Sequence, residues 1–194
     1  MGFSHGAEVV VQEVDDENWK VVRSFSYAGE KESFTVPVGQ LTDFASVPRV
    51  FVWFLPRYGR YTLAAILHDY LWRVGVPNGE LAYRDADGIF RRAMHELGVP
   101  FAKRWSMWSA VRWAGLFRPG GRRGWLRDAP AVLLTTLLAL PFLAPTGALI
   151  SLALLLMYVI EWLVALPLLS HHAVARAAGK TPKKVNLPKL HWKM

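Results

Sequence analysis

One long apolar stretch near the C-terminus constrains the fold of this chain more than any other feature. Hydrophobic residues make up 53% of the 194 residues, and between Ala129 and Leu169 the only charged residue is Glu161. This stretch is about twice as long as the ~20 residues that one membrane-spanning helix requires. The chain therefore has room for one ordinary soluble domain followed by a membrane segment.

The apolar stretch contains residues that favour a turn, namely Pro145, Thr146 and Gly147. We therefore predict a C-terminal transmembrane helical hairpin, with one helix over residues 129–144 and the other over residues 148–169. The first segment is short for a span, so a re-entrant loop or a single span is the alternative. A single span would place the two ends of the chain on opposite sides of the membrane.

Positive charge flanks the apolar stretch on both sides. The chain carries 23 Lys and Arg against 15 Asp and Glu, and basic residues gather in a juxtamembrane linker at residues 118–128 and in a tail at residues 170–194. The positive-inside rule then predicts a multi-pass membrane protein with both ends in the cytoplasm. Because anionic headgroups attract such residues, we expect membrane lipid as the partner and no nucleic acid. The sequence indicates no particular protein partner.

Two absences bear on the compartment. Residues 1–12 lack the apolar core of a secretory signal peptide, so we expect no cleaved leader. The chain also has no cysteine, which fits a reducing compartment and excludes a disulfide-stapled secreted domain.

The region before the hairpin has the pattern of an α+β domain. Residues 1–40 form a β-rich segment, predicted as a small antiparallel meander because alternating or β-branched stretches occur at residues 8–14, 19–27 and 33–38. A helical core follows over residues 41–117. Periodicity predicts three helices in that core, over residues 60–74, 81–97 and 101–116.

The helical core places a histidine and an aspartate where apolar side chains are expected. His68 shares a helical stripe with Trp72, and Asp87 shares one with Phe90 and Met94. Two helices joined by a short connection pack antiparallel, so the imidazole and the carboxylate can meet. The carboxylate would then hold the ring's tautomer and stabilise its cationic form, as a general base requires. The alternative is a satisfied buried polar pair without chemistry.

Further carboxylates flank this pair. Asp69 follows His68 in the chain, and Asp43 lies in a turn that ends at Pro48. Because calcium binds loop carbonyls together with carboxylates, these residues form a candidate cation site. The alternative for Asp43 is an Asx-turn or a helix cap. Asp85 is predicted to face solvent.

Four motifs occur in order between Thr35 and Gly115: LTDFASVPR, AAILHDYLW, ADGIFRRAM and WSMWSAVRWAG. In these motifs the chain resembles a domain-of-unknown-function family that is common in bacteriophages and bacterial prophages. That resemblance implies no function.

The same motifs are similar, more distantly, to the bacterial secretory phospholipase A₂ family. That family has a Thr-Asp loop ending in Pro, a helix with His-Asp-x-x-Tyr and a helix with Asp-x-x-Phe-x-x-x-Met. The resemblance implies a three-helix phospholipase A₂-like core, with His68 as the base that activates water and Asp87 as the carboxylate that orients it. It also implies calcium as the cofactor, held by Asp43, the carbonyl of Phe44 and Asp69.

The chain departs from the lipase pattern in two ways. Trp72 stands where the family has Tyr, which removes a hydroxyl that would hydrogen-bond the dyad carboxylate, and the family's disulfides are absent. The His-Asp pair also occurs in metal-dependent phosphohydrolases of the HD type. Those enzymes need a further upstream His ligand, and the only upstream histidine here is His5.

Other features bear on membrane contact. Glu161, inside the predicted second span, marks either a functional site or a side chain that reaches the interface. The third helix carries three tryptophans interleaved with arginines, which form either an interfacial face or part of the core. These residues are Trp105, Trp108 and Trp113, with Arg104 and Arg112.

Two classes of function follow from these observations. The first is a membrane-anchored, calcium-dependent hydrolase of phospholipid esters. The second is a catalytically silent, membrane-associated phage or prophage protein with a structural or interaction role.

Overall fold

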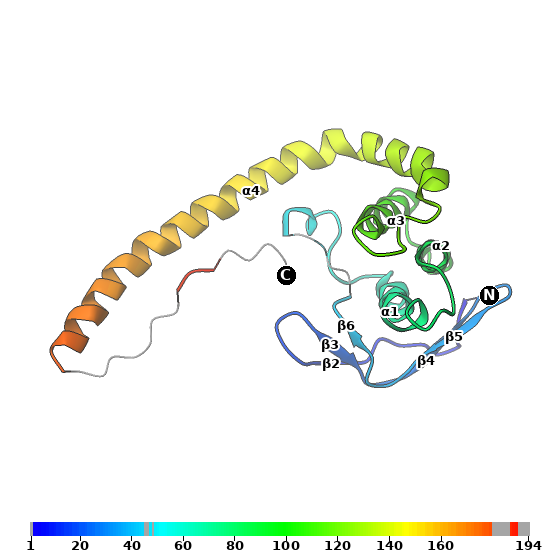
Figure 1. Ribbon diagram of the computed structural model, residues 1–194, viewed down its shortest axis with the longest axis horizontal. Helices are drawn as coiled ribbons and strands as arrows, with labels where there is room; N and C mark the ends of the chain where they lie inside the picture. Colours follow the sequence, from blue (N-terminus) through cyan, green and yellow to red (C-terminus); the bar gives the residue numbers. More distant parts are fainter. Residues whose placement is uncertain (1, 45–46, 48, 180–186, 190–194) are drawn as a thin grey trace.

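The structure is a computed structural model that describes residues 2–44, 47, 49–179 and 187–189. Small antiparallel sheets come first, helices follow, and a long apolar helix lies at the C-terminal end (Figure 1). This order confirms the predicted α+β class.

The β-rich segment forms two sheets instead of one meander. Their strand orders are β1-β4-β5 and β2-β3-β6, and each sheet is antiparallel. The strand predicted over residues 19–27 is split, because Val21 exchanges backbone hydrogen bonds with Gly39 and Gln40 whereas Phe25 pairs with Val36 in the other sheet. The strands are β1 (Gly2–Phe3), β2 (Val11–Glu13), β3 (Trp19–Val21), β4 (Phe25–Ala28), β5 (Ser33–Val36) and β6 (Leu41–Thr42).

The predicted core helices all form, with one change. The first of them ends as an α-helix at Tyr70 and continues as a π-helical turn, a feature that is frequent at functional sites. The helical elements are the 3₁₀ turn η1 (Arg49–Phe51), α1 (Thr62–Tyr70), the π turn η2 (Leu71–Gly75), α2 (Tyr83–Glu96), α3 (Phe101–Gly115) and α4 (Trp125–Ala177).

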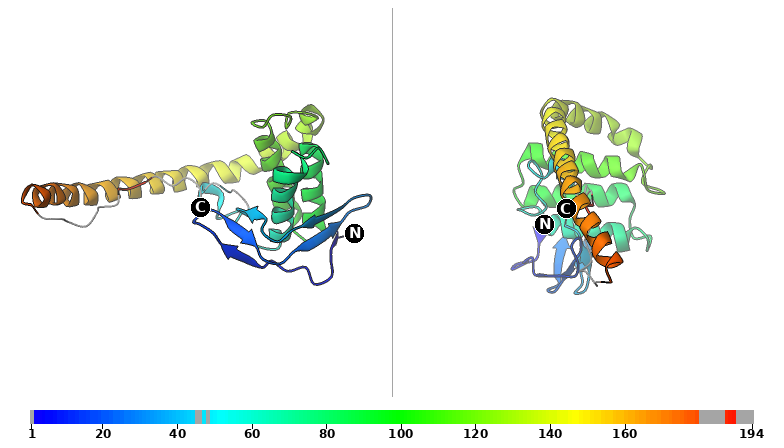
Figure 2. Two further views of the ribbon diagram at one scale, coloured as in Figure 1. Left: turned by 60° about the horizontal axis from the view of Figure 1, so that its bottom comes forward. Right: turned by 90° about the vertical axis from the view of Figure 1, so that its left-hand side faces the viewer.

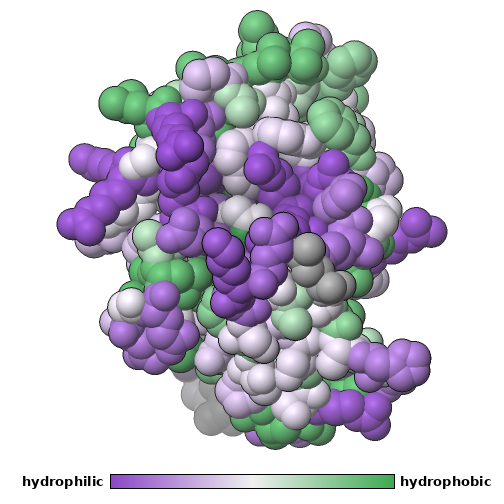
Figure 3. All heavy atoms as spheres, turned by 90° about the vertical axis from the view of Figure 1, so that its right-hand side faces the viewer, coloured by the Kyte–Doolittle hydropathy of each residue, from purple (hydrophilic) through white to green (hydrophobic). Residues whose placement is uncertain are grey.

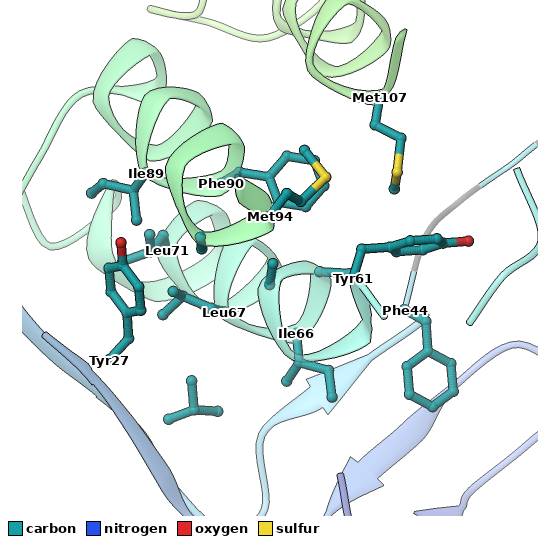
Figure 4. Close-up of a cluster of buried hydrophobic side chains, with 14 of the residues drawn as sticks. Tyr27, Phe44, Tyr61, Ile66, Leu67, Leu71, Ile89, Phe90, Met94 and Met107 are labelled. Carbon is teal, nitrogen blue, oxygen red and sulfur yellow. The ribbon is translucent and has the colours of Figure 1, made fainter. Parts of the chain in front are cut away.

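The hydrophobic core lies between the sheets and the stacked helices α1, α2 and α3 (Figure 2). Tyr27 of β4, Leu67 of α1, Leu71 of η2 and Met94 of α2 are completely or almost completely buried in it (Figure 4). Burying one such side chain contributes about 1.5–3 kcal/mol. This burial holds α1 against α2, the two helices that carry His68 and Asp87.

The predicted hairpin does not form. Pro145, Thr146 and Gly147 lie inside α4, which runs for 53 residues, or about 80 Å at ~1.5 Å per residue. Proline in a long apolar helix can bend the helix instead of ending it, and Figure 1 shows α4 bending where its ribbon turns from green to yellow. The Thr146 hydroxyl also donates to the Phe142 carbonyl at 3.0 Å, as expected within a continuous helix. A two-span topology is therefore not supported.

The two halves of α4 have different surroundings. The first half packs on α3 and η1, burying Val132 and bringing Gly147 close to Phe51. The second half is exposed, with Leu149 and Leu163 at 68% and 62% exposure. Among the described residues, α4 is the one helix long and apolar enough to cross a membrane. It begins inside the predicted basic linker and continues into the predicted tail, of which residues 180–186 and 190–194 lie outside the described residues.

Candidate functional site

The structure brings His68 and Asp87 together. Nε2 of His68 lies 2.8 Å from Oδ1 of Asp87, across the contact between α1 and α2. Asp87 is completely buried, and His68 retains 7% of its surface. Because an ionised carboxylate only accepts hydrogen bonds, Nε2 carries the proton and Nδ1 is left as the basic nitrogen.

Trp72 replaces the tyrosine hydroxyl that the lipase pattern has at its position. Its indole Nε1 donates to Oδ1 of Asp87 at 2.9 Å, so the dyad carboxylate keeps a hydrogen bond from this position although the hydroxyl is absent. Trp72 reaches Asp87 from the π turn η2, and the centre of its ring lies 5.0 Å from the centre of the His68 ring. The indole therefore both anchors the carboxylate and packs against the imidazole.

An arginine completes the surroundings of Asp87. Nη1 of Arg112, on α3, donates to Oδ2 of Asp87 at 3.0 Å, and both side chains are completely buried. On its other side, Nε of Arg112 lies 3.2 Å from Oδ2 of Asp128, in the first turn of α4. Asp128 also accepts two hydrogen bonds of 2.9 Å from Arg84 of α2. This network balances two carboxylates with two guanidinium groups and ties α2, α3 and α4 together.

The second group of carboxylates is centred on Asp69. The Thr42 hydroxyl donates to Oδ2 of Asp69 at 2.5 Å and accepts the backbone N–H of Phe44 at 2.9 Å, so it fixes the loop after β6 to α1. Burial raises the pKa of Asp69 well above its usual value, and the nearby charge of Asp43 raises it further. Nη2 of Arg73 lies 3.6 Å from Oδ1 of Asp43. Phe44 has a φ of 61°, a strained value for a bulky residue.

One pocket of about 520 Å³ collects these predicted residues. His68, Asp69, Asp43 and Phe44 all line it, whereas Asp87 lies behind His68 and outside the lining. Its remaining walls are mostly apolar, with two arginines. They are formed by Val47, Leu55, Ala65, Trp72, Arg73, Phe90, Met107, Ala110, Val111, Ala114 and Arg118.

Other predicted residues lie apart from the pocket. Asp85 is exposed, as predicted, and its Oδ2 accepts the backbone N–H of Ala82 at 3.4 Å. Glu161 is exposed on the free half of α4, and His5 is exposed near the N-terminus. Within the described residues, no group of three or more His, Asp and Glu side chains is arranged to hold a metal ion. Ser46 and Pro48 of the acidic turn lie outside these residues.

Sequence reasoning missed Arg112 and Thr42. Arg112 was assigned to a tryptophan-rich face, of which Trp108 is buried and Trp105 and Trp113 are half-buried. A signal for Arg112 was available, since it stands one helical turn after Trp108 on the buried side of α3. Thr42 had the sequence of an ST-turn, with its hydroxyl two residues before the bonded N–H.

The comparisons with known proteins cover the middle of the chain. Residues 19–111 match the family model described as "Protein of unknown function (DUF1353)". The matched stretch holds Asp43, His68, Asp69 and Asp87, and it ends one residue before Arg112. No curated protein and no solved structure matches the chain.

Proposed function

We propose that the pocket beside His68 hydrolyses ester bonds of phospholipids, with calcium as the cofactor. One observation carries the proposal: His68, hydrogen-bonded to Asp87 at 2.8 Å, lines the same pocket as Asp43, Phe44 and Asp69. A base and two carboxylates around one apolar pocket suit the activation of water for attack on an ester.

His68 acts as the general base. Asp87 holds the proton on Nε2, so Nδ1 accepts the proton of the attacking water. Trp72 and Arg112 each donate to Asp87, at 2.9 and 3.0 Å, and keep the carboxylate from rotating away from the ring. The water's oxygen attacks the ester carbonyl directly, and no serine nucleophile is needed. The bond from the carbonyl carbon to the glycerol oxygen then breaks, and that oxygen takes the proton from Nδ1 of His68, which leaves a fatty acid and a lysophospholipid.

The pocket lining favours an anionic amphiphile as the substrate. Phe44, Phe90 and Met107 provide apolar walls for an acyl chain. Arg73 and Arg118, which also line the pocket, supply positive charge for a phosphate. A phospholipid combines these two properties within one molecule.

The donor chemistry at Asp69 fits a hard cation. Asp43 raises the pKa of Asp69, which means that the two carboxylates repel each other, and a cation between them would remove that repulsion. Asp43, Asp69 and the Phe44 carbonyl supply oxygen ligands, and water or substrate would complete the six to eight that calcium takes. When bound, calcium would polarise the ester carbonyl and stabilise its developing negative charge.

Membrane anchoring by α4 would hold the pocket near such a substrate. At about 1.5 Å per residue the exposed residues 148–169 extend for about 33 Å, close to the ~30 Å of a hydrocarbon core. Figure 3 shows the side of the molecule opposite this half of α4, where hydrophilic side chains gather across the middle of the face. One span places the two ends of the chain on opposite sides of the membrane.

The test is release of fatty acid from vesicles by the full chain. With equal parts of phosphatidylglycerol and phosphatidylcholine and with calcium present, wild-type protein should release fatty acid, and chelation should abolish the release. His68→Gln should lower the rate by about 10²–10⁴-fold, the usual contribution of a general base. His95→Gln is the matched control, because His95 is exposed on α2.

A second candidate is a silent membrane-associated protein that keeps the buried network for its fold. The observation that favours it is the completely buried Asp87–Arg112 pair, which has structural importance whether or not His68 reacts. Folded wild-type protein that releases no fatty acid, with or without calcium, would support this candidate. Equal measurable rates for His68→Gln and wild type would instead show that the release does not depend on His68.

A further inference from the structure

A second groove lies away from the dyad, where α4 crosses α3. It has a volume of about 650 Å³, and large apolar side chains form most of its walls. They include Phe54, Phe101, Trp105, Leu134, Leu138 and Phe142. The groove shares no lining residue with the pocket beside His68.

The groove has few polar groups that could form hydrogen bonds with water. Among the described residues that line the groove, only Ser106 and Thr135 carry hydroxyl groups. The Thr135 hydroxyl is already used within α4, where it donates to the Ala131 carbonyl at 2.8 Å. Phe101, Leu138 and Phe142 are 65–73% exposed to water, so an apolar occupant that covers them is favoured.

Two arginine side chains lie against aromatic rings of the groove wall. Cζ of Arg91 lies 4.4 Å from the ring centre of Trp105, and Cζ of Arg104 lies 5.7 Å from that of Phe101. These guanidinium groups are suited to an anionic headgroup whose chain lies along the rings.

The groove leads into the free half of α4. Leu134, Leu138 and Phe142 belong to the first half of that helix, which continues without a break into the exposed leucines after residue 147. Figures 1 and 2 show this second half extending away from the domain. An apolar wall that is continuous with a membrane-compatible helix favours a lipid over a second copy of the chain.

We propose that this groove binds one acyl chain of an anionic phospholipid, with the headgroup at Arg91 and Arg104. The lipid would act as a fixed filler between α3 and α4, separate from any lipid that enters the pocket beside His68. The proposal does not depend on hydrolysis, because its test measures retention of lipid.

Native mass spectrometry of the full chain in detergent tests the proposal, with palmitoyl-oleoyl phosphatidylglycerol or phosphatidylcholine added. We expect one phosphatidylglycerol to be retained per chain, and phosphatidylcholine to be retained at least tenfold less. Ala102→Trp and Ala131→Trp fill the groove and should each lower retention at least tenfold. Leu152→Trp, on the exposed half of α4, is the matched control and should retain the lipid.

A thiol-protection measurement covers the case in which a filled variant fails to fold. The chain has no cysteine, so Ser106→Cys introduces a single thiol into the groove with little change in size. Phosphatidylglycerol should slow its alkylation at least fivefold, and it should leave the exposed Ser33→Cys thiol unaffected. Unchanged alkylation at position 106 would overturn the proposal. So would retention that survives in both folded filled variants, or equal retention of the two lipids.

Discussion

Arg112 and Asp87 form an ion pair in which neither side chain has any exposed surface, with Nη1 3.0 Å from Oδ2. The pair joins α3 to the carboxylate that orients His68, so the geometry of the dyad depends on a helix that does not carry it. Asp128 lies on the far side of Arg112 and extends this dependence to the start of α4. The fold of the site and the placement of the apolar helix are therefore linked through one guanidinium group.

We expect Arg112→Ala to destabilise the protein by about 3–5 kcal/mol, because it leaves Asp87 buried without a cation. Urea unfolding of the detergent-solubilised chain measures the change. Arg123→Ala, at an exposed position, should stay within about 0.5 kcal/mol of wild type. A similar small loss for Arg112→Ala would show that water or another group reaches Asp87.

Trp72→Phe should lower the free energy of unfolding by about 1.5–3 kcal/mol, because Asp87 loses a charge-assisted hydrogen bond. The matched control is Trp53→Phe. That indole donates to the Val50 carbonyl at 3.0 Å in an exposed position, and its loss should cost less than about 1 kcal/mol. Equal losses in the two variants would contradict a special role for the Trp72 indole.

Tyr61→Phe should raise stability, because the Tyr61 hydroxyl is buried without a hydrogen-bond partner among the described residues. Burial also raises the pKa of Tyr61 to about 12. A raised pKa means that wild-type stability is lost as the pH rises from about 10 towards 12, since the unfolded phenol ionises first. The variant should not show this part of the loss of stability at high pH. Parallel unfolding curves at pH 9 and pH 11.5 check the prediction.

Asp69→Asn should stabilise the calcium-free protein at pH 8 more than at pH 4. The pKa of Asp69 is raised in the folded state, so its stabilising contribution is complete below the unfolded value and is lost as the pH rises towards the folded value. Thermal unfolding in chelator at the two pH values measures the difference. Added calcium should then raise the unfolding temperature of wild type and not of the variant. A variant that is less stable than wild type at pH 8 in chelator would contradict the argument.

A single span predicts that the two ends of the chain react from opposite sides of a membrane. Ser4→Cys and Ala178→Cys each introduce one thiol at an exposed position on either side of the free half of α4. In oriented vesicles, an impermeant thiol reagent should label one of the two before lysis and both after it. Labelling of both thiols from the same side would contradict a single span and support the hairpin topology.

Much of the helical core could be predicted from the sequence. The stripe that includes His68 and the stripe that includes Asp87 each indicated a core-facing side chain, and burial of Leu67 and Met94 between them brings the two helices into contact. These two inferences succeeded because a helical period places side chains on a known face. The resemblance to the phospholipase A₂ family, and not periodicity, implied that Asp43 and Asp69 lie together, and both line one pocket.

The β segment and the C-terminal helix were predicted less well. Local β propensity does not say which strands will pair. It therefore could not predict that β3 pairs with β6 in one sheet and β4 with β5 in the other. Pro145 and Gly147 favour a turn in isolation. In the fold, the segment is part of α4, where Gly147 lies close to Phe51.

Periodicity and composition are local properties, so they were sufficient to predict an apolar helical region and a polar pair on facing helices. The three-dimensional packing was needed to show that Trp72 and Arg112 complete the surroundings of Asp87, and that Thr42 ties the acidic loop to Asp69. Those contacts join residues from separate elements. Their partners are selected by packing distance and by the cost of leaving a buried charge or donor unpaired, which no local pattern records.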